Sequence, residues 1–142
     1  ASAILFLLEQ HKLVVEGAGA VGTAAIMHNK INVEGKKVVL PLSGGNIDVT
    51  MLAQIIEKGL VKSSRKMNLV VTLIDKPGSL KGLTNIFEEL NANIVQIDYD
   101  RNSVTLDFGD ANVTIGLETK GEEHQNKIRE QLSLNGYRFR EL

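Results

Sequence analysis

The feature that most constrains the fold is the order of apolar patterns that begins at Met67. Residues 67–74 form an apolar run typical of a strand, and "NIVQIDYD" and "NVTIGLE" alternate apolar and polar residues as half-buried strands do. Residues 80–90, and a later segment with Ile128 and Leu132, repeat apolar residues at helical spacing, and Tyr137 and Phe139 mark a last strand. This succession predicts a ferredoxin-like α+β domain of the order βαββαβ.

In such a domain both helices cover one face of the sheet. On the strand that contains "NIVQIDYD", the alternation places Val95, Ile97 and Tyr99 on one side. The face away from the helices is expected to present a set of polar residues, namely Gln96, Asp98, Thr114, Glu118, Arg138 and Arg140.

The polar segment "KSSRK" at residues 62–66 predicts a linker between domains 1–65 and 66–142. In the first domain we expect α/β structure: a helix at residues 3–10, a strand at 13–15, a Gly/Ala-rich helix to about Met27, a strand at 37–42 and a helix from Asn46, with Gly59 as its C-cap. This is part of an α/β domain, because about 60 residues are too few for a complete doubly wound sheet.

Composition excludes several classes of function. The net charge is −1 and aromatic residues make up 4% without tryptophan, so we expect no nucleic-acid partner. Cysteine is absent and the three histidines, His11, His28 and His124, lack ligand spacing, so no metal site is predicted. The apolar run of residues 4–8 is too short to span a membrane, and a cytoplasmic protein is expected.

Two glycine-rich stretches lie in the first domain. "EGAGAVG" has the G-x-G-x-x-G spacing of a dinucleotide-binding turn at Gly17, Gly19 and Gly22, but no acidic residue ends the next strand to bind a ribose. The charge of Glu16 beside the place of a pyrophosphate also opposes nucleotide binding, and we interpret the glycines as small residues that allow tight helix–strand packing. "PLSGGNID" follows an apolar run, and its Ser43-Gly44-Gly45 is either a plain turn with an N-cap at Asn46 or Asp48, or a loop that approaches a ligand closely.

Together, "VVEGAGAVGTAAI" and "KKVVLPLSGGNID" resemble the carboxy-terminal end of the catalytic domain in fold-type II pyridoxal-phosphate (PLP) enzymes, in particular the threonine/serine ammonia-lyase group. "DKPGSL" after the first strand of the second domain resembles an ACT domain, an amino-acid-sensing module. The resemblance implies a PLP-dependent lyase that deaminates L-threonine to 2-oxobutanoate and ammonia, as in isoleucine biosynthesis, and assembles as a homo-oligomer.

The resemblance also implies roles for residues. Ser43 is expected to hydrogen-bond the cofactor's pyridine nitrogen, which a hydroxyl does not force into its protonated form. Gly44 and Gly45 let the backbone approach the ring, and Glu16 and Gly17 match a loop beside it. The family's Schiff-base lysine has no counterpart here and the chain starts without Met, so a fragment that is inactive alone is expected.

For the ACT-like domain, an amino-acid effector is expected between one chain's Pro-Gly loop and a neighbouring chain's strand start. The residues implied are Asp75, Pro77, Gly78, Ser79 and Leu80 on the loop, with Asn93 and Ile94 on the strand. Two other functions remain open: the tail of an ACT-bearing nicotinamide dehydrogenase that uses the Gly17–Gly22 turn, and a stand-alone amino-acid-binding regulatory protein.

Overall fold

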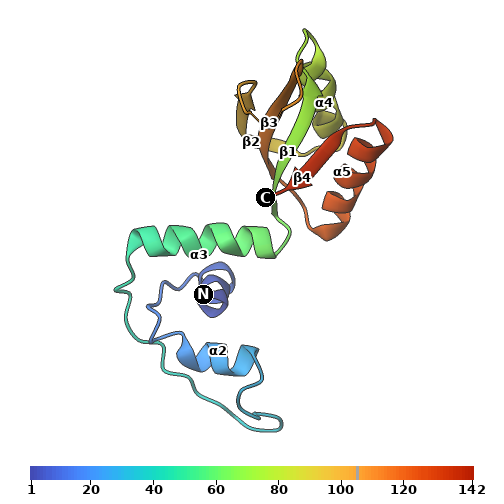
Figure 1. Ribbon diagram of the computed structural model, residues 1–142. Coiled ribbons are helices and arrows are strands. Elements are labelled where there is room, and N and C mark those ends of the chain that lie inside the picture. The colour runs from blue at the N-terminus through green and yellow to red at the C-terminus, as the bar shows by residue number, and fades with distance from the viewer. Residues whose placement is uncertain (105) are drawn as a thin grey trace. The chain divides into compact units, whose positions relative to one another are not determined.

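The computed structural model describes residues 1–104 and 106–142, which form two compact units, Ala1–Gly59 and Leu60–Leu142 (Figure 1). The change between units falls inside helix α3 (Val49–Lys62), a few residues before the linker that the sequence predicts. The domain boundary between residues 65 and 66 stays a prediction.

The second unit contains the elements predicted from the apolar patterns, in the predicted order. These are β1 (Lys66–Ile74), α4 (Ser79–Glu89), β2 (Asn93–Asp100), β3 (Asp110–Glu118), α5 (Glu122–Leu134) and β4 (Arg138–Glu141). The four strands form one antiparallel sheet in the order β2-β3-β1-β4, so the two central strands, β1 and β3, are paired on both sides.

Helices α4 and α5 supply one side of a single core in this unit. Leu83 and Phe87 of α4 and Ile128 of α5 are fully buried against alternate residues of β1 and β3. Each such side chain contributes about 1.5–3 kcal/mol to folding by leaving water. The strand residues on this face are Met67, Leu69, Val71 and Leu73 of β1 and Val113, Ile115 and Leu117 of β3.

The opposite face of the sheet carries the predicted polar residues. The register pairs Val70 with both Thr114 and Arg140, and Asp98 with Thr114. Since paired residues in adjacent strands share a face, the predicted set Gln96, Asp98, Thr114, Glu118, Arg138 and Arg140 lies together on the face away from the helices.

One prediction for β2 is wrong, because the strand contains a β-bulge. The register shifts between Ile94, which pairs with Leu117, and Gln96, which pairs with Gly116. A Cβ built on Gly116 would lie 3.4 Å from Val95 Cγ2 and 3.2 Å from Gln96 Cβ, so both side chains are on the polar face. Ile97 lies opposite Ile115 on the helix face, so Val95 does not share its side.

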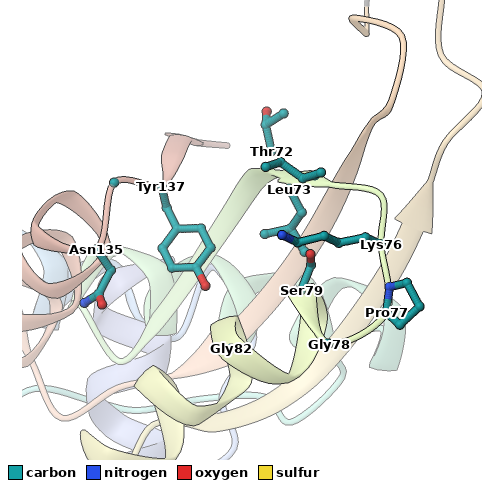
Figure 2. Close-up of a pocket in the computed structure, with 11 residues that line it drawn as sticks. Thr72, Leu73, Lys76, Pro77, Gly78, Ser79, Gly82, Asn135 and Tyr137 are labelled. Carbon is teal, nitrogen blue, oxygen red and sulfur yellow. The ribbon is translucent and has the colours of Figure 1, made fainter.

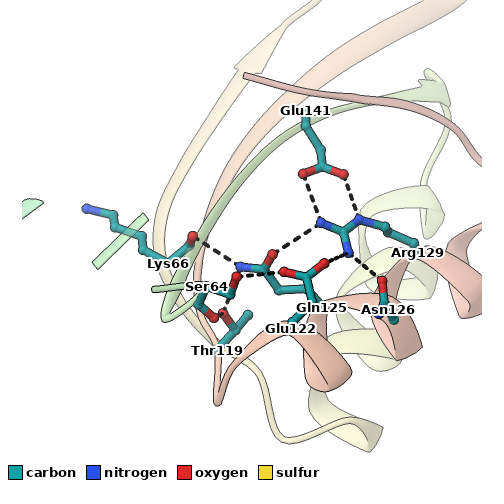
Figure 3. A network of polar contacts seen from close by, with 8 residues as sticks. All are labelled: Ser64, Lys66, Thr119, Glu122, Gln125, Asn126, Arg129 and Glu141. Carbon is teal, nitrogen blue, oxygen red and sulfur yellow. Dashed lines mark hydrogen bonds and ion pairs between the residues drawn. The ribbon is translucent and has the colours of Figure 1, made fainter. Parts of the chain in front are cut away.

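A polar network ties the start of β1 to α5 and β4 (Figure 3). Arg129 of α5 donates to both carboxylate oxygens of Glu141, at 2.7 and 3.2 Å, and to Glu122 Oε1 at 3.2 Å. Buried Gln125 donates to the carbonyl of Lys66 at 3.2 Å and accepts from Arg129 at 3.2 Å. The last strand and the entry into the first strand are therefore held to one helix.

The first unit consists of α1 (Ser2–His11), α2 (Val21–Met27) and the amino-terminal part of α3. Its core is small and contains Ala3, Ile4, Leu7, Val15 and Ala20, with Ala24, Ile47, Leu52 and Ile55 packed against it. Of the two predicted N-cap candidates, Asn46 and Asp48, it is Asp48 that caps α3. Its carboxylate accepts a hydrogen bond of 3.0 Å from the Met51 amide.

Three predictions for the first unit are wrong. Residues 13–15 and 37–42 form no strand: among the described residues they pair with no other segment, and a strand is stable only beside a partner. Gly59 is not a C-cap, since α3 continues to Lys62. A Cβ at Gly59 would collide with Leu5, so this glycine allows α1 and α3 to approach.

Candidate functional site

The loop after β1 is the feature around which the candidate site of the second unit is built. The Asp75 amide donates to the carbonyl of Gly109 at 2.8 Å, which fixes the start of the loop. Gly78 adopts a φ of +90° as the N-cap residue of α4, and its carbonyl accepts from Gly82 at 3.0 Å. This left-handed conformation favours glycine, so the loop needs Gly78 to enter the helix at this angle.

A cavity of about 500 Å³ lies on the β2 side of this loop, and we call it the Tyr99 pocket. Tyr99 donates a hydrogen bond of 2.9 Å to Asp75 Oδ1, and the Arg101 guanidinium lies 3.2 Å from the same oxygen. Arg101 also lies 5.7 Å from the centroid of the Tyr99 ring. The lining residues are Asp75, Lys76, Pro77, Gly78, Leu80, Tyr99 and Arg101.

The charges of the Tyr99 pocket suit a zwitterion. Asp75 offers a carboxylate to an ammonium group, while Lys76 and Arg101 offer cations to a carboxylate. Burial raises the pKa of Tyr99, and the hydrogen bond to the Asp75 carboxylate and its charge raise it further. The phenol therefore stays protonated and acts as a hydrogen-bond donor at neutral pH.

The structure brings together most of the predicted effector residues. Asp75, Pro77, Gly78 and Leu80 line the Tyr99 pocket, whereas Ser79 lies on the other side of the loop. The amide of Ser79 donates to the carbonyl of Lys76 at 3.3 Å. Two further predicted residues, Asn93 and Ile94, pair with Glu118 and Leu117 at the opposite end of the sheet. Their place in a neighbouring chain stays a prediction.

A second cavity, of about 400 Å³, lies on the β4 side of the same loop, and we call it the Tyr137 pocket (Figure 2). It is lined by Thr72, Leu73, Ile74, Lys76, Pro77, Gly78, Ser79, Gly82, Asn135, Gly136 and Tyr137. The loop therefore separates two cavities and contributes Lys76, Pro77 and Gly78 to both.

In the first unit, the two glycine-rich stretches are in contact. The Glu16 amide donates to the carbonyl of Gly44 at 2.8 Å. Gly44 adopts a φ of +73°, and a Cβ there would collide with the carboxylate of Glu16. Ser43, Gly44 and Gly45 are exposed and Glu16 is half-buried. The structure thus assembles all the predicted cofactor residues in one surface region of this unit, with Gly17 next to Glu16.

The same contact accounts for the dinucleotide-like spacing. A Cβ on Gly19 would collide with the carbonyl oxygen of Ser43, and one on Gly22 would lie 3.0 Å from Leu40 Cδ2. Gly19 is therefore required for the chain to pack against the backbone of Ser43, and Gly22 leaves room for the side chain of Leu40. This observation favours the packing interpretation of "EGAGAVG", which needs no bound nucleotide.

Sequence reasoning missed three residues of the Tyr99 pocket, namely Lys76, Tyr99 and Arg101. The alternation of the strand predicts only which side of the sheet Tyr99 faces. The signal was present in "DYDR", where an aromatic and a cation end an apolar strand, but only the antiparallel pairing of β2 with β3 brings that end of the strand to the loop after β1.

Other classes of site are not indicated within residues 1–104 and 106–142. This part of the chain contains no group of three acidic or histidine side chains able to hold a metal ion. Nor does it contain a helix with the length and apolar character needed to cross a bilayer.

Comparison with known proteins gives clear relatives by sequence. The chain is 49% identical to an L-threonine ammonia-lyase of Thermotoga maritima over 99% of its length and 35% of that protein. An L-threonine ammonia-lyase of Geobacter sulfurreducens is 44% identical over 96% of the chain and 34% of that protein. A biosynthetic L-threonine dehydratase of Halalkalibacterium halodurans is 28% identical over 98% and 33%.

The chain thus spans about a third of the length of these curated relatives, and the resemblance to the threonine ammonia-lyase group is confirmed. No model of a known protein family matches the chain. Among solved structures, prephenate dehydratase from Streptococcus mutans aligns with 54% of this chain and 40% of its own, at a TM-score of 0.46 and 23% identity.

Proposed function

We propose that this chain is the carboxy-terminal part of an L-threonine ammonia-lyase, because nearly all of it is similar to about a third of the length of such enzymes. The first unit completes a pyridoxal-phosphate site, and the second unit is a regulatory domain of the ACT type that binds an amino acid. The reaction of the whole enzyme is the deamination of L-threonine to 2-oxobutanoate and ammonia, in the cytoplasm. The contact between Glu16 and Gly44, which joins the two family motifs, is the observation that carries the proposal.

The residues of the first unit fit a planar ring cofactor. Gly44 and Gly45 expose backbone without a Cβ, and at Gly44 the positive φ disfavours a side chain, which would also displace the nearby Glu16 carboxylate. The cofactor, when bound, supplies the electron sink that α-carbanion chemistry on an amino acid requires. Ser43 would hold its pyridine nitrogen, while Gly44 and Gly45 would face the ring.

The role of Ser43 follows from the chemistry of a hydroxyl. A carboxylate at this position would favour a protonated pyridine nitrogen, because opposite charges stabilise each other. The Ser43 hydroxyl donates or accepts a single neutral hydrogen bond and leaves the nitrogen less protonated. This keeps the electron sink weaker and favours loss of the β-hydroxyl over return of a proton to the cofactor.

For the second unit we propose that the Tyr99 pocket binds an amino-acid effector. The ammonium group would contact Asp75, and the carboxylate would contact Arg101 or the amides of the loop near Gly78. A homo-oligomer would place Asn93 and Ile94 of a neighbouring chain near the loop. Binding then couples to subunit geometry, which gives an allosteric link between effector and active site.

The experiment for the cofactor site compares Ser43→Ala and Ser43→Asp with Ser133→Ala in the full-length enzyme. Ser133 is a matched control, since it lies in α5 of the second unit and its hydroxyl donates to the carbonyl of Arg129. We expect Ser43→Asp to shift products from 2-oxobutanoate toward transamination, and Ser133→Ala to leave the near-visible cofactor absorbance unchanged. Equal product ratios in all variants would exclude contact between Ser43 and the pyridine nitrogen.

The experiment for the effector site uses Gly78→Asp, which adds a side chain and a negative charge at the loop. We expect a weaker response to amino acids with unchanged cofactor absorbance, because the two units carry separate sites. An unchanged effector response in Gly78→Asp would show that the loop does not bind the effector.

The isolated chain should show no ammonia release from threonine, since it lacks a counterpart of the family's Schiff-base lysine.

A further inference from the structure

We propose that the Tyr137 pocket is a separate binding site, specific for a small aliphatic carboxylate that carries no ammonium group. The cavity lies on the β4 side of the loop after β1 and measures about 400 Å³, a size at which proteins bind small molecules. Nothing in the proposed lyase function assigns a ligand to it, and the inference does not depend on that function.

Three polar side chains from three segments converge on this cavity. Figure 2 shows the ammonium of Lys76, the hydroxyl of Ser79 and the hydroxyl of Tyr137 directed toward the space between α4 and the loop before β4. Within the described part of the chain, none of these three side chains has a hydrogen-bond or ion-pair partner. Three donors without partners at one cavity are therefore available to a ligand.

The charge of the lining defines the class of ligand. Of the eleven residues that line the Tyr137 pocket, Lys76 is the one charged residue, and none is acidic. A carboxylate gains a charge-assisted hydrogen bond from Lys76, whereas an ammonium group would face a like charge with no carboxylate to accept from it. The Tyr99 pocket differs in this respect, because Asp75 lines it.

The shape of the cavity depends on glycine. Gly82 lies inside α4, where glycine costs about 1 kcal/mol relative to alanine and where no positive φ requires it. A Cβ at this position would lie 3.2 Å from the Tyr137 hydroxyl, so the missing side chain leaves that hydroxyl open to the cavity. The ring of Tyr137 and the exposed Ile74 supply apolar surface for a short carbon chain.

The test uses three four-carbon carboxylates that differ in the substituent on carbon 2. They are butyrate, 2-oxobutanoate and L-2-aminobutyrate, and inorganic phosphate is a further probe. Each is titrated into the 142-residue chain, and amide shifts of Gly78, Gly82 and Gly136 are followed by NMR. We expect saturable shifts with butyrate or 2-oxobutanoate, and none at Gly82 and Gly136 with L-2-aminobutyrate. Binding of phosphate alone, or no saturation with either carboxylate up to about 20 mM, would overturn the proposal.

Variants separate this site from the effector site. We expect Lys76→Gln and Tyr137→Phe each to weaken carboxylate binding about tenfold, as removal of a hydrogen bond to a charged group does. Lys81→Gln removes the same charge from an exposed lysine outside both linings and should bind as the native chain does. If Asp75→Asn abolishes binding while Tyr137→Phe does not, the ligand occupies the Tyr99 pocket and the proposal is wrong.

A last variant guards against loss of folding. Gly82→Ala should narrow the cavity and weaken binding, while it raises or preserves the stability of α4 because alanine favours helices. Weaker binding together with unchanged or higher stability therefore indicates occupancy of the cavity. Unchanged binding in Gly82→Ala would contradict the proposed position of the ligand.

Discussion

The amide of Glu16 lies 2.8 Å from the carbonyl oxygen of Gly44, so two loops whose bonded residues are 28 positions apart in sequence are joined by a backbone hydrogen bond. The hydrogen bond brings the Glu16 side chain over Gly44, where a Cβ would collide with its carboxylate. The φ of +73° favours glycine at this position, and a larger residue would also displace the Glu16 carboxylate.

Gly44→Ala is therefore expected to destabilise the first unit by about 1–3 kcal/mol, the usual cost of a non-glycine residue in a strained left-handed conformation. Gly17→Ala is the stability control, because Gly17 has no positive φ and no atom within 4 Å of the position of a Cβ. Hydrogen–deuterium exchange of peptides from residues 1–30 measures the difference. Equal exchange in both variants would contradict the contact.

Asp75→Asn is expected to lower the pKa of Tyr99 toward its ordinary value of 10.0, leaving the part that burial causes. Absorbance near 295 nm in a Tyr137→Phe background follows Tyr99 alone, since the chain has two tyrosines. Asp98→Asn is the control, because Asp98 lies on the polar face and contacts Gln96. If Asp75→Asn leaves the pKa of Tyr99 unchanged, Asp75 does not contribute to raising it.

The direction of this pKa shift also fixes a pH dependence. The folded chain holds the Tyr99 proton more tightly than the unfolded chain does. The contribution to stability is therefore present below pH 10.0 and is lost as pH rises through the raised value. Asp75→Asn should reduce this loss of stability at high pH.

Sequence patterns predicted the second unit well because its signals are local. Alternation in β1 and β3, and the helical repeat of Leu83, Ile86 and Phe87, report burial directly. The bulge at Val95 was not predictable, since it arises from pairing with Gly116 on another strand. A single inserted residue there reversed the predicted face of one side chain.

The first unit shows the opposite case. Residues 13–15 and 37–42 have strand-like composition, yet strand pairing requires a partner that composition does not report. The candidate cofactor residues were recognised from their motifs, and their proximity required the structure. The Tyr99 pocket required the sheet order, because its tyrosine and its aspartate are 24 residues apart.

Arg129→Met is expected to destabilise the second unit by about 1–3 kcal/mol at neutral pH, because Glu141 and buried Gln125 lose a charged donor. Urea unfolding, followed by methyl signals of Val113 and Ile115, measures the change. Lys127→Gln is the control, since its pair with Glu123 is an exposed i,i+4 contact and should matter little.

The same network predicts sensitivity to acid. The hydrogen bond from Arg129 lowers the pKa of Glu141, and the hydrogen bond from Ser64 lowers that of Glu122. Carboxylates with lowered pKa values stabilise the fold above their ordinary value of 4.5, and this contribution is lost as pH falls below it. Arg129→Met should flatten this acid dependence. If the stability of Arg129→Met falls as steeply with decreasing pH as that of the native chain, other groups cause the sensitivity to acid.

The last prediction concerns β2, the longer edge strand of the sheet. Val95 on the polar face, and Ile97 and Tyr99 on the helix face, are 45%, 44% and 40% exposed, so both faces of this edge strand present apolar side chains. Such an edge favours pairing with another strand, and a lysine within it opposes pairing. If a second copy of the chain pairs along this edge in the proposed homo-oligomer, Ile97→Lys should shift the mass measured by light scattering toward the monomer. Val104→Lys places the same charge on a fully exposed valine outside the strand and should leave the mass unchanged. A native chain that is monomeric at all concentrations would show that this edge does not assemble the protein.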